Sequence, residues 1–241
     1  MKKEKYKVEF HVHTSASHDS ILTKYFLFLM CKLRKIDCLA IADHNEVKNA
    51  LKYKDFFEKK GIHIIVGEEI LTKEGEIIGL FLNKKIEPYL SLEETIKRIR
   101  GQEGLVYVPH PYDGKRSKTV LNKKSIEKNK KNIDFIECHN GRNVKKEYSE
   151  MQNEIAKEVG ITKIIGSDAH TFYEIGRNYC IVNSLEKDKL KDEIKNASFI
   201  KKDCIKFAHL NTKFVRLYKI IKGGKWDELS RIINKKLKRN K

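Results

Sequence analysis

Two histidines in the segment His11-Val12-His13 stand one residue apart, directly after an apolar run that is typical of a strand. Alternate side chains of a strand point to the same side, so both imidazoles can face one ion. A carboxylate, Asp19, follows six positions after His13. A single pair of this kind is often only polar surface, and its meaning depends on the other motifs of the chain.

Further imidazoles and carboxylates follow other apolar runs. In parallel α/β folds functional residues collect at the C-terminal ends of strands, so we expect these side chains to converge. A set of ligands that consists of imidazole nitrogens and carboxylate oxygens, with no thiolate, suits divalent zinc, manganese or iron. Eight candidate ligands exceed the four of one tetrahedral ion, which predicts two or three divalent ions. The candidates are His11, His13, Asp19, His44, Glu69, His110, Asp168 and His170.

Such a cluster could hydrolyse a phosphate ester. A bound metal lowers the pKa of its water from 15.7 to about 7, so that hydroxide exists at neutral pH. Two ions can also neutralise the phosphoryl oxygens and clamp the attacking and leaving oxygens. The motifs therefore predict phosphoester hydrolysis by metal-activated hydroxide.

The elements that must position these residues alternate along the chain. We expect strands at 7–12, 38–42, 63–66, 76–82, 105–108, 133–138, 163–166 and 179–182. We expect helices at 23–35, 45–60, 145–159, 207–221 and 226–237, and the capping box Ser91-Leu92-Glu93-Glu94 opens another. Apolar runs alternating with helices predict a parallel sheet covered by helices, here a closed α/β barrel over residues 1–182. Residues 183–241 are expected to form a mainly helical extension packed on it.

Composition narrows the function classes. The chain has 241 residues, of which 40% are hydrophobic, enough for one large domain with a full core. No window resembles a membrane span, so we expect no membrane partner. The N-terminus lacks a secretory pattern and the five cysteines show no CxxC spacing, so we expect a reducing cytoplasm. The net charge of +18 either reflects a general lysine bias or favours phosphate-bearing partners. A basic cluster ends the chain: Lys235, Lys236, Lys238, Arg239 and Lys241.

As a set, the motifs resemble those of the PHP family (polymerase and histidinol phosphatase). The segments are His11-Val12-His13-Thr14, Ala42-Asp43-His44-Asn45, Gly67-Glu68-Glu69, Pro109-His110-Pro111 and Gly166-Ser167-Asp168-Ala169-His170. The resemblance runs in order from about residue 8 to about residue 182. It implies a distorted seven-stranded (β/α) barrel with a trinuclear metal site that hydrolyses phosphoesters.

The resemblance also implies which residues share an ion. The first ion would be held by His11, His13, Glu69 and Asp168. Glu69 would bridge to a second ion, which His110 also holds, and the third would be held by Asp19, His44 and His170. Asp43 would orient a neighbouring ligand, as carboxylates behind metal ligands do.

Two places depart from the fullest family pattern. His18 stands beside Asp19 and could compete with it as a ligand. Some members complete the second ion with a histidine shortly after residue 142, where this chain has Asn143, so His139 is a candidate substitute. Arg142 is expected to clamp phosphate, since its planar fork suits phosphate oxygens.

The substrate is left open by the sequence. We expect a small phosphorylated molecule, with the basic charge favouring a nucleotide. One alternative is a nuclease that acts on nucleic-acid ends and holds the strand with the basic C-terminus. Another is a non-catalytic PHP module that serves as a scaffold.

Overall fold

The computed structural model describes residues 4–114, 116 and 119–237. Three residues of the basic C-terminal cluster, Lys238, Arg239 and Lys241, lie outside this range. Within the described residues, no helix is long and apolar enough to cross a membrane.

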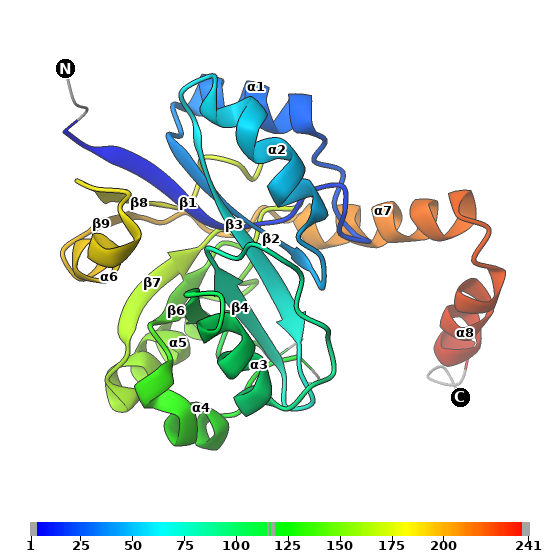
Figure 1. The fold of residues 1–241 in the computed structure, drawn as a ribbon. Coiled ribbons are helices and arrows are strands. Elements are labelled where there is room, and N and C mark those ends of the chain that lie inside the picture. Colours follow the sequence, from blue (N-terminus) through cyan, green and yellow to red (C-terminus); the bar gives the residue numbers. More distant parts are fainter. Residues whose placement is uncertain (1–3, 115, 117–118, 238–241) are drawn as a thin grey trace.

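Nine strands and eight α-helices make up the described chain (Figure 1). The strands are β1 (Tyr6–Val12), β2 (Cys38–His44), β3 (His63–Leu71), β4 (Glu76–Leu80), β5 (Leu105–Val108), β6 (Phe135–Asn140), β7 (Thr162–Gly166), β8 (Tyr179–Val182) and β9 (Ser198–Ile200). The helices are α1 (Lys24–Arg34), α2 (Lys48–Glu58), α3 (Leu92–Arg100), α4 (Lys123–Asn129), α5 (Lys146–Val159), α6 (Lys187–Lys195), α7 (Ala208–Lys222) and α8 (Trp226–Leu237). A short 3₁₀ helix, Lys130–Asn132, follows α4.

The first seven strands form a nearly closed barrel. The sheet order is β7-β6-β5-β4-β3-β2-β1-β8-β9. The segment after β7 returns to β1, because the Ser167 amide donates to the Phe10 carbonyl and the His13 amide donates to the Ala169 carbonyl, each at 2.9 Å. This closure confirms the predicted distorted seven-stranded barrel.

The sheet is mixed, and here the expectation of a parallel sheet was wrong. Strand β4 runs antiparallel to both β3 and β5. The connection from β3 to β4 spans only residues 72–75, which is too short for the helical crossover that a parallel pair requires. Within that turn the Thr72 hydroxyl donates to the Gly75 carbonyl at 2.6 Å.

Helices cover the outside of the barrel, and the apolar strand residues lie between the layers. Helix α2 buries Tyr53 and Phe57 against the sheet. Helix α3 begins as its capping sequence predicts, because the Ser91 hydroxyl accepts from the Glu94 amide at 3.2 Å. The helices thus bury the apolar side chains on the outside of the barrel.

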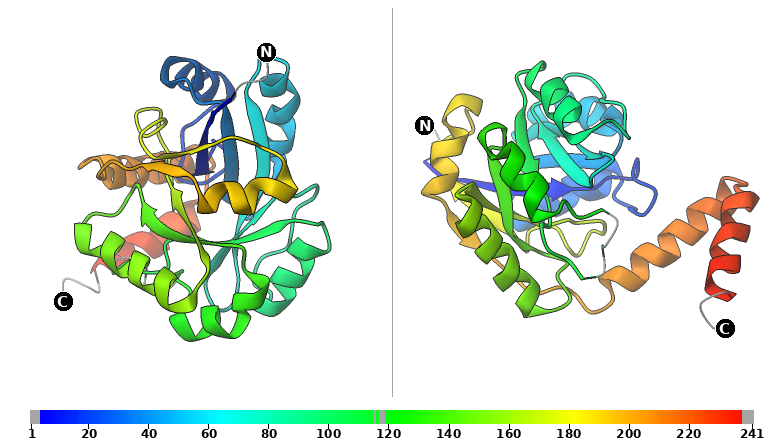
Figure 2. Two further views of the ribbon diagram at one scale, coloured as in Figure 1. Left: turned by 90° about the vertical axis from the view of Figure 1, so that its left-hand side faces the viewer. Right: turned by 90° about the horizontal axis from the view of Figure 1, so that it is seen from below.

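The C-terminal part is not wholly helical. Strand β9 pairs antiparallel with β8 at the edge of the sheet, beside α6. Helix α7 then leaves the barrel and α8 folds back at its end, so that both project from the body (Figures 1 and 2). The division into a barrel up to residue 182 and a separate extension stays a prediction.

Candidate metal centre

Three of the predicted ligands have an uncommon backbone conformation. The φ angles are 63° at His11, 29° at His110 and 52° at Asp168, all positive and all at non-glycine residues. The β1–β2 register also shifts between Glu9 and Val12, as at a bulge. Such conformations cost free energy and tend to occur where a fold must aim a side chain at a functional site.

Side chains from β1, β3 and the segment after β7 meet at the centre of the mouth. His11 Nε2 lies 3.3 Å from Glu69 Oε1 and 3.7 Å from Asp168 Oδ1. His13 Nε2 lies 3.5 Å from Glu69 Oε2 and 3.4 Å from Asp168 Oδ1. All four side chains are fully buried.

Two further groups flank this centre. On one side His110 Nε2 lies 3.0 Å from Glu69 Oε1. On the other side His44 Nδ1 lies 2.8 Å from Glu69 Oε2, and the Asp19 Oδ1 atom lies 3.7 Å from His44 Nε2 and 3.3 Å from His170 Nε2. The structure thus brings all eight predicted ligands into one cluster.

Several ligand atoms in this cluster are buried and make no hydrogen bond. They are His11 Nε2, His13 Nε2, Asp19 Oδ1, Glu69 Oε2 and Asp168 Oδ1. A buried polar atom without a partner is costly, so native proteins seldom tolerate several together. Imidazole nitrogens and carboxylate oxygens facing one another at 3–4 Å fit divalent cations between them.

The charges in the cluster also favour a bound cation. Burial opposes protonation of His11, but the carboxylates of Glu69, Asp168 and Glu137 outweigh it and raise the pKa of His11 well above its usual value. Burial likewise opposes ionisation of Asp168, yet Arg116 and His11 hold the pKa of its carboxyl well below the usual range. The carboxylates around His11 therefore favour positive charge there, and a divalent ion would replace the proton on His11.

Asp43 lies behind the cluster, not in it. Its carboxylate accepts from the Thr14 amide, the Thr14 hydroxyl and the Ser17 hydroxyl, each at 2.6 Å. The Ser17 oxygen in turn lies 3.2 Å from His13 Nδ1 and accepts from the His44 amide at 3.2 Å. This is the geometry of a carboxylate that orients neighbouring ligands through a serine.

Glu137, on β6, has the same kind of position and was not predicted from the sequence. Its carboxylate accepts from His11 Nδ1 at 2.7 Å, the Tyr107 hydroxyl at 2.5 Å, the His110 amide at 2.7 Å and Asn140 Nδ2 at 2.9 Å. The available signal was an acid between the apolar residues Ile136 and Cys138 of that strand.

Glu76 and Arg116 were also missed. Glu76 begins β4, and its carboxylate lies 3.6 Å from His110 Nε2 and 4.0 Å from His44 Nδ1. Burial raises the pKa of Glu76, as does the neighbouring carboxylate of Glu69. Arg116 comes from the loop after β5 and donates to Asp168. Neither residue follows an apolar run directly, so no strand-end pattern marked them.

Arg142, the predicted phosphate clamp, is only 3% exposed. Its Nη2 donates to the Thr212 hydroxyl at 3.1 Å, and its Nε lies 3.6 Å from Glu174 Oε1 without a hydrogen bond. The guanidinium thus lies between α7 and the segment after β7. Its role toward substrate stays a prediction.

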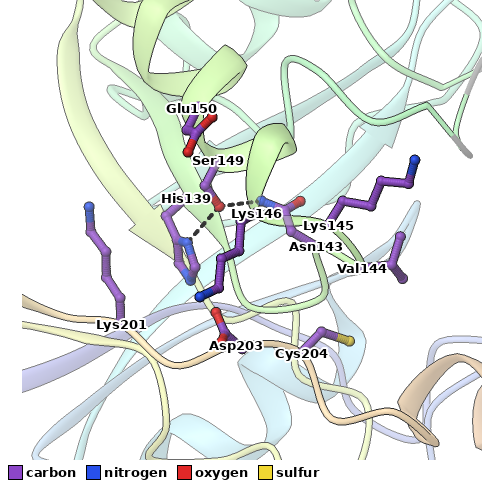
Figure 3. A pocket seen from close by; sticks show the side chains of 10 residues that line it. All are labelled: His139, Asn143, Val144, Lys145, Lys146, Ser149, Glu150, Lys201, Asp203 and Cys204. Atoms are coloured by element: carbon purple, nitrogen blue, oxygen red, sulfur yellow. Dashed lines mark hydrogen bonds between the residues drawn. The ribbon is translucent and has the colours of Figure 1, made fainter.

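His139 does not join the cluster. Its Nδ1 lies 2.9 Å from the Ser149 hydroxyl and its Nε2 lies 3.2 Å from Asn178 Oδ1. The ring lines a separate pocket beside α5, together with Lys146 and Lys201 (Figure 3). His18 is nearer the ligands, with its Nε2 at 3.9 Å from Asp19 Oδ2, but its side chain is 53% exposed.

The barrel and the cluster at its mouth define an α/β protein with a candidate metal centre, and comparison with known proteins gives the family. The PHP domain model matches residues 9–236, and the chain belongs to this family. An uncharacterized protein of Methanocaldococcus jannaschii is 34% identical over 188 residues, which are 77% of this chain and 74% of that protein. A second uncharacterized protein of the same organism is 39% identical over 116 residues, 44% of this chain and 68% of that protein.

A solved structure shows the same fold at low identity. It is a two-domain protein from Bacteroides vulgatus that contains a predicted PHP-like metal-dependent phosphoesterase. The TM-score is 0.66 and the sequence identity 16%, over 82% of this chain. This chain spans 65% of the Bacteroides protein.

Proposed function

We propose that this protein is a metal-dependent phosphoesterase that hydrolyses a phosphomonoester or a nucleotide. The observation that carries the proposal is the set of buried ligand atoms that face one another without hydrogen bonds. Family membership and the Bacteroides structure support it. A scaffold module would not need so complete a set of ligands, which favours an enzyme.

We assign the ligands to three positions for divalent zinc, manganese or iron. The first takes His11, His13, Glu69 and Asp168. The second shares Glu69 and adds His110 and Glu76, so that Glu76 supplies the ligand that the sequence left missing. The third takes Asp19, His44 and His170.

Ions bound there would supply an activated water and neutralise phosphoryl charge. Glu137 and Asp43 hold the ligand imidazoles in place. Arg116, at the rim with its side chain 20% exposed, and Arg142 are the cationic groups assigned to the phosphoryl oxygens.

The reducing cytoplasm expected from cysteine usage fits the five free thiols.

A panel assay tests this function. Phosphomonoesters, nucleoside 3′,5′-bisphosphates and short oligonucleotides are each incubated with manganese and with zinc. We expect turnover of a monoester or nucleotide that His44→Ala reduces strongly while the fold persists. The matched control is His63→Ala, since His63 is exposed at the start of β3, remote from the ligands along the same strand. Turnover of oligonucleotides alone would favour the nuclease, and no turnover with any metal would argue for the scaffold.

A further inference from the structure

The loop of residues 14–20, here named the Asp19 loop, carries one predicted ligand and is held from outside the barrel. Lys219 Nζ, from α7, donates to the carbonyls of Ser15 at 2.9 Å, Ser17 at 2.6 Å and Ser20 at 2.7 Å. An ammonium has three donors, and all three are used on this one loop. Residues 199 to 204 positions apart in the sequence are thereby joined.

Two side chains of the same loop, those of Ser17 and Asp19, point toward the metal centre. Asp19 reaches His44 and His170, and the Ser17 hydroxyl reaches Asp43. The carbonyls bound by Lys219 flank Asp19 on both sides in sequence. Fixing those carbonyls therefore restricts where the Asp19 carboxylate can lie.

Helix α7 also contacts the barrel at a second place, so the helix that carries Lys219 is itself held in position. His209 Nε2 donates to the Arg142 carbonyl at 2.8 Å, and the Thr212 hydroxyl accepts from the Arg142 guanidinium. Thr212 and Lys219 are seven residues apart, about 10 Å along one helix face. These hydrogen bonds join the helix to Arg142 at one point and to the Asp19 loop at the other.

Other lysines of α7 lack such contacts. Lys213 is exposed, whereas Lys219 is partly buried, and burial lowers the pKa of Lys219 against the opposing effect of Asp19 and Asp43. A lysine that serves only to keep a helix soluble would remain in water. The partial burial of Lys219 against three carbonyl oxygens therefore indicates a specific contact.

We infer that Lys219 is a positioning residue, which holds the Asp19 loop so that Asp19 meets His44 and His170 at the third metal position. The inference rests on the metal centre proposed above. It makes the C-terminal helix part of the site, although no ligand lies on that helix. A residue that merely docks α7 would leave metal affinity unchanged when replaced.

The test compares Lys219→Met with Lys213→Met, which removes the same charge from an exposed position of the same helix. Hydrogen exchange is measured on the metal-free protein. We expect amides of the Asp19 loop to exchange at least about tenfold faster in Lys219→Met than in wild type, with Lys213→Met unchanged. Equal exchange in all three proteins would overturn the inference.

The second readout is the affinity for manganese and for zinc, measured by titration, together with the number of bound ions from metal analysis. We expect Lys219→Met to weaken the binding of one ion roughly 10–100-fold, as loss of groups behind metal ligands does. Lys219→Arg, which keeps the charge and the donors, should retain most of that affinity. On an Asp19→Ala background Lys219→Met should add no further loss, because its effect runs through Asp19. An equal loss on both backgrounds would overturn the inference.

The two proposals fail in different ways. Wild-type protein that binds no divalent ion contradicts the metal centre, and the inference falls with it. Wild-type protein that binds ions while Lys219→Met binds them equally contradicts only the role of Lys219. Unfolding midpoints of each variant establish that the fold is kept.

Discussion

Replacing Glu137 by glutamine tests the support behind the ligands while keeping the volume of the side chain. The carboxylate accepts four hydrogen bonds, two on each oxygen. Burial favours the neutral acid, but His11 and the hydrogen bonds to the carboxylate hold the pKa of Glu137 below its usual value. Glutamine therefore removes a buried negative charge and one acceptor oxygen.

The magnitude follows from the partners. If the amide oxygen keeps His11 and Tyr107, the amide nitrogen faces two donors, the His110 amide and Asn140 Nδ2. Each buried group left without a partner costs roughly 1–3 kcal/mol, so we expect the free energy of unfolding to fall by about 2–6 kcal/mol. Metal affinity should fall roughly 10–100-fold, because His11 loses its orienting carboxylate.

Urea unfolding of the metal-free protein and competition with a chelator measure these two effects. The matched control is Glu154→Gln, an exposed glutamate on α5, for which we expect no change in either quantity. If Glu137→Gln unfolds within about 0.5 kcal/mol of wild type and binds metal equally, then the carboxylate does not support the site as argued.

Three further outcomes are expected. Burial raises the pKa of Glu9 to about 8, so the stability that the neutral acid contributes is full below the pKa of the unfolded state and is lost as the pH rises through 8. The urea midpoint of the wild type should therefore fall between pH 5 and pH 9, and Glu9→Gln should make this fall less steep; an unchanged slope would contradict this. Ser91→Ala removes the cap of α3 and should lower the free energy of unfolding by about 1 kcal/mol, whereas no measurable change would show that the cap is idle. Asp43→Asn should weaken metal binding roughly tenfold by freeing Ser17, as read by the same chelator competition, and full affinity would refute its orienting role.

The ligands could be predicted because their positions are local in the sequence. All but Asp19 follow, or end, an apolar run, and the parallel strands of the barrel bring such positions to one mouth. His11 and His110 illustrate this, since β1 and β5 lie apart in the sheet and the two rings still come within 5.8 Å between centroids.

The supporting residues could not be predicted in that way. Glu137 is found only by asking why an acid stands inside a buried strand, and Glu76 depends on the antiparallel turn from β3 to β4. Lys219 is one lysine among many in a basic chain, and its contact with the Asp19 loop depends on where α7 docks. Long-range docking of this kind leaves no pattern in the local sequence.

The central claim is that the buried cluster binds divalent cations. The most direct measurement is the metal content of the purified protein, before and after loading with zinc or manganese and removal of loosely bound ions. We predict two or three ions per chain in wild type and fewer in Asp168→Asn, because Asp168 faces both His11 and His13. Protein that retains its fold and holds no ion after loading would contradict the account.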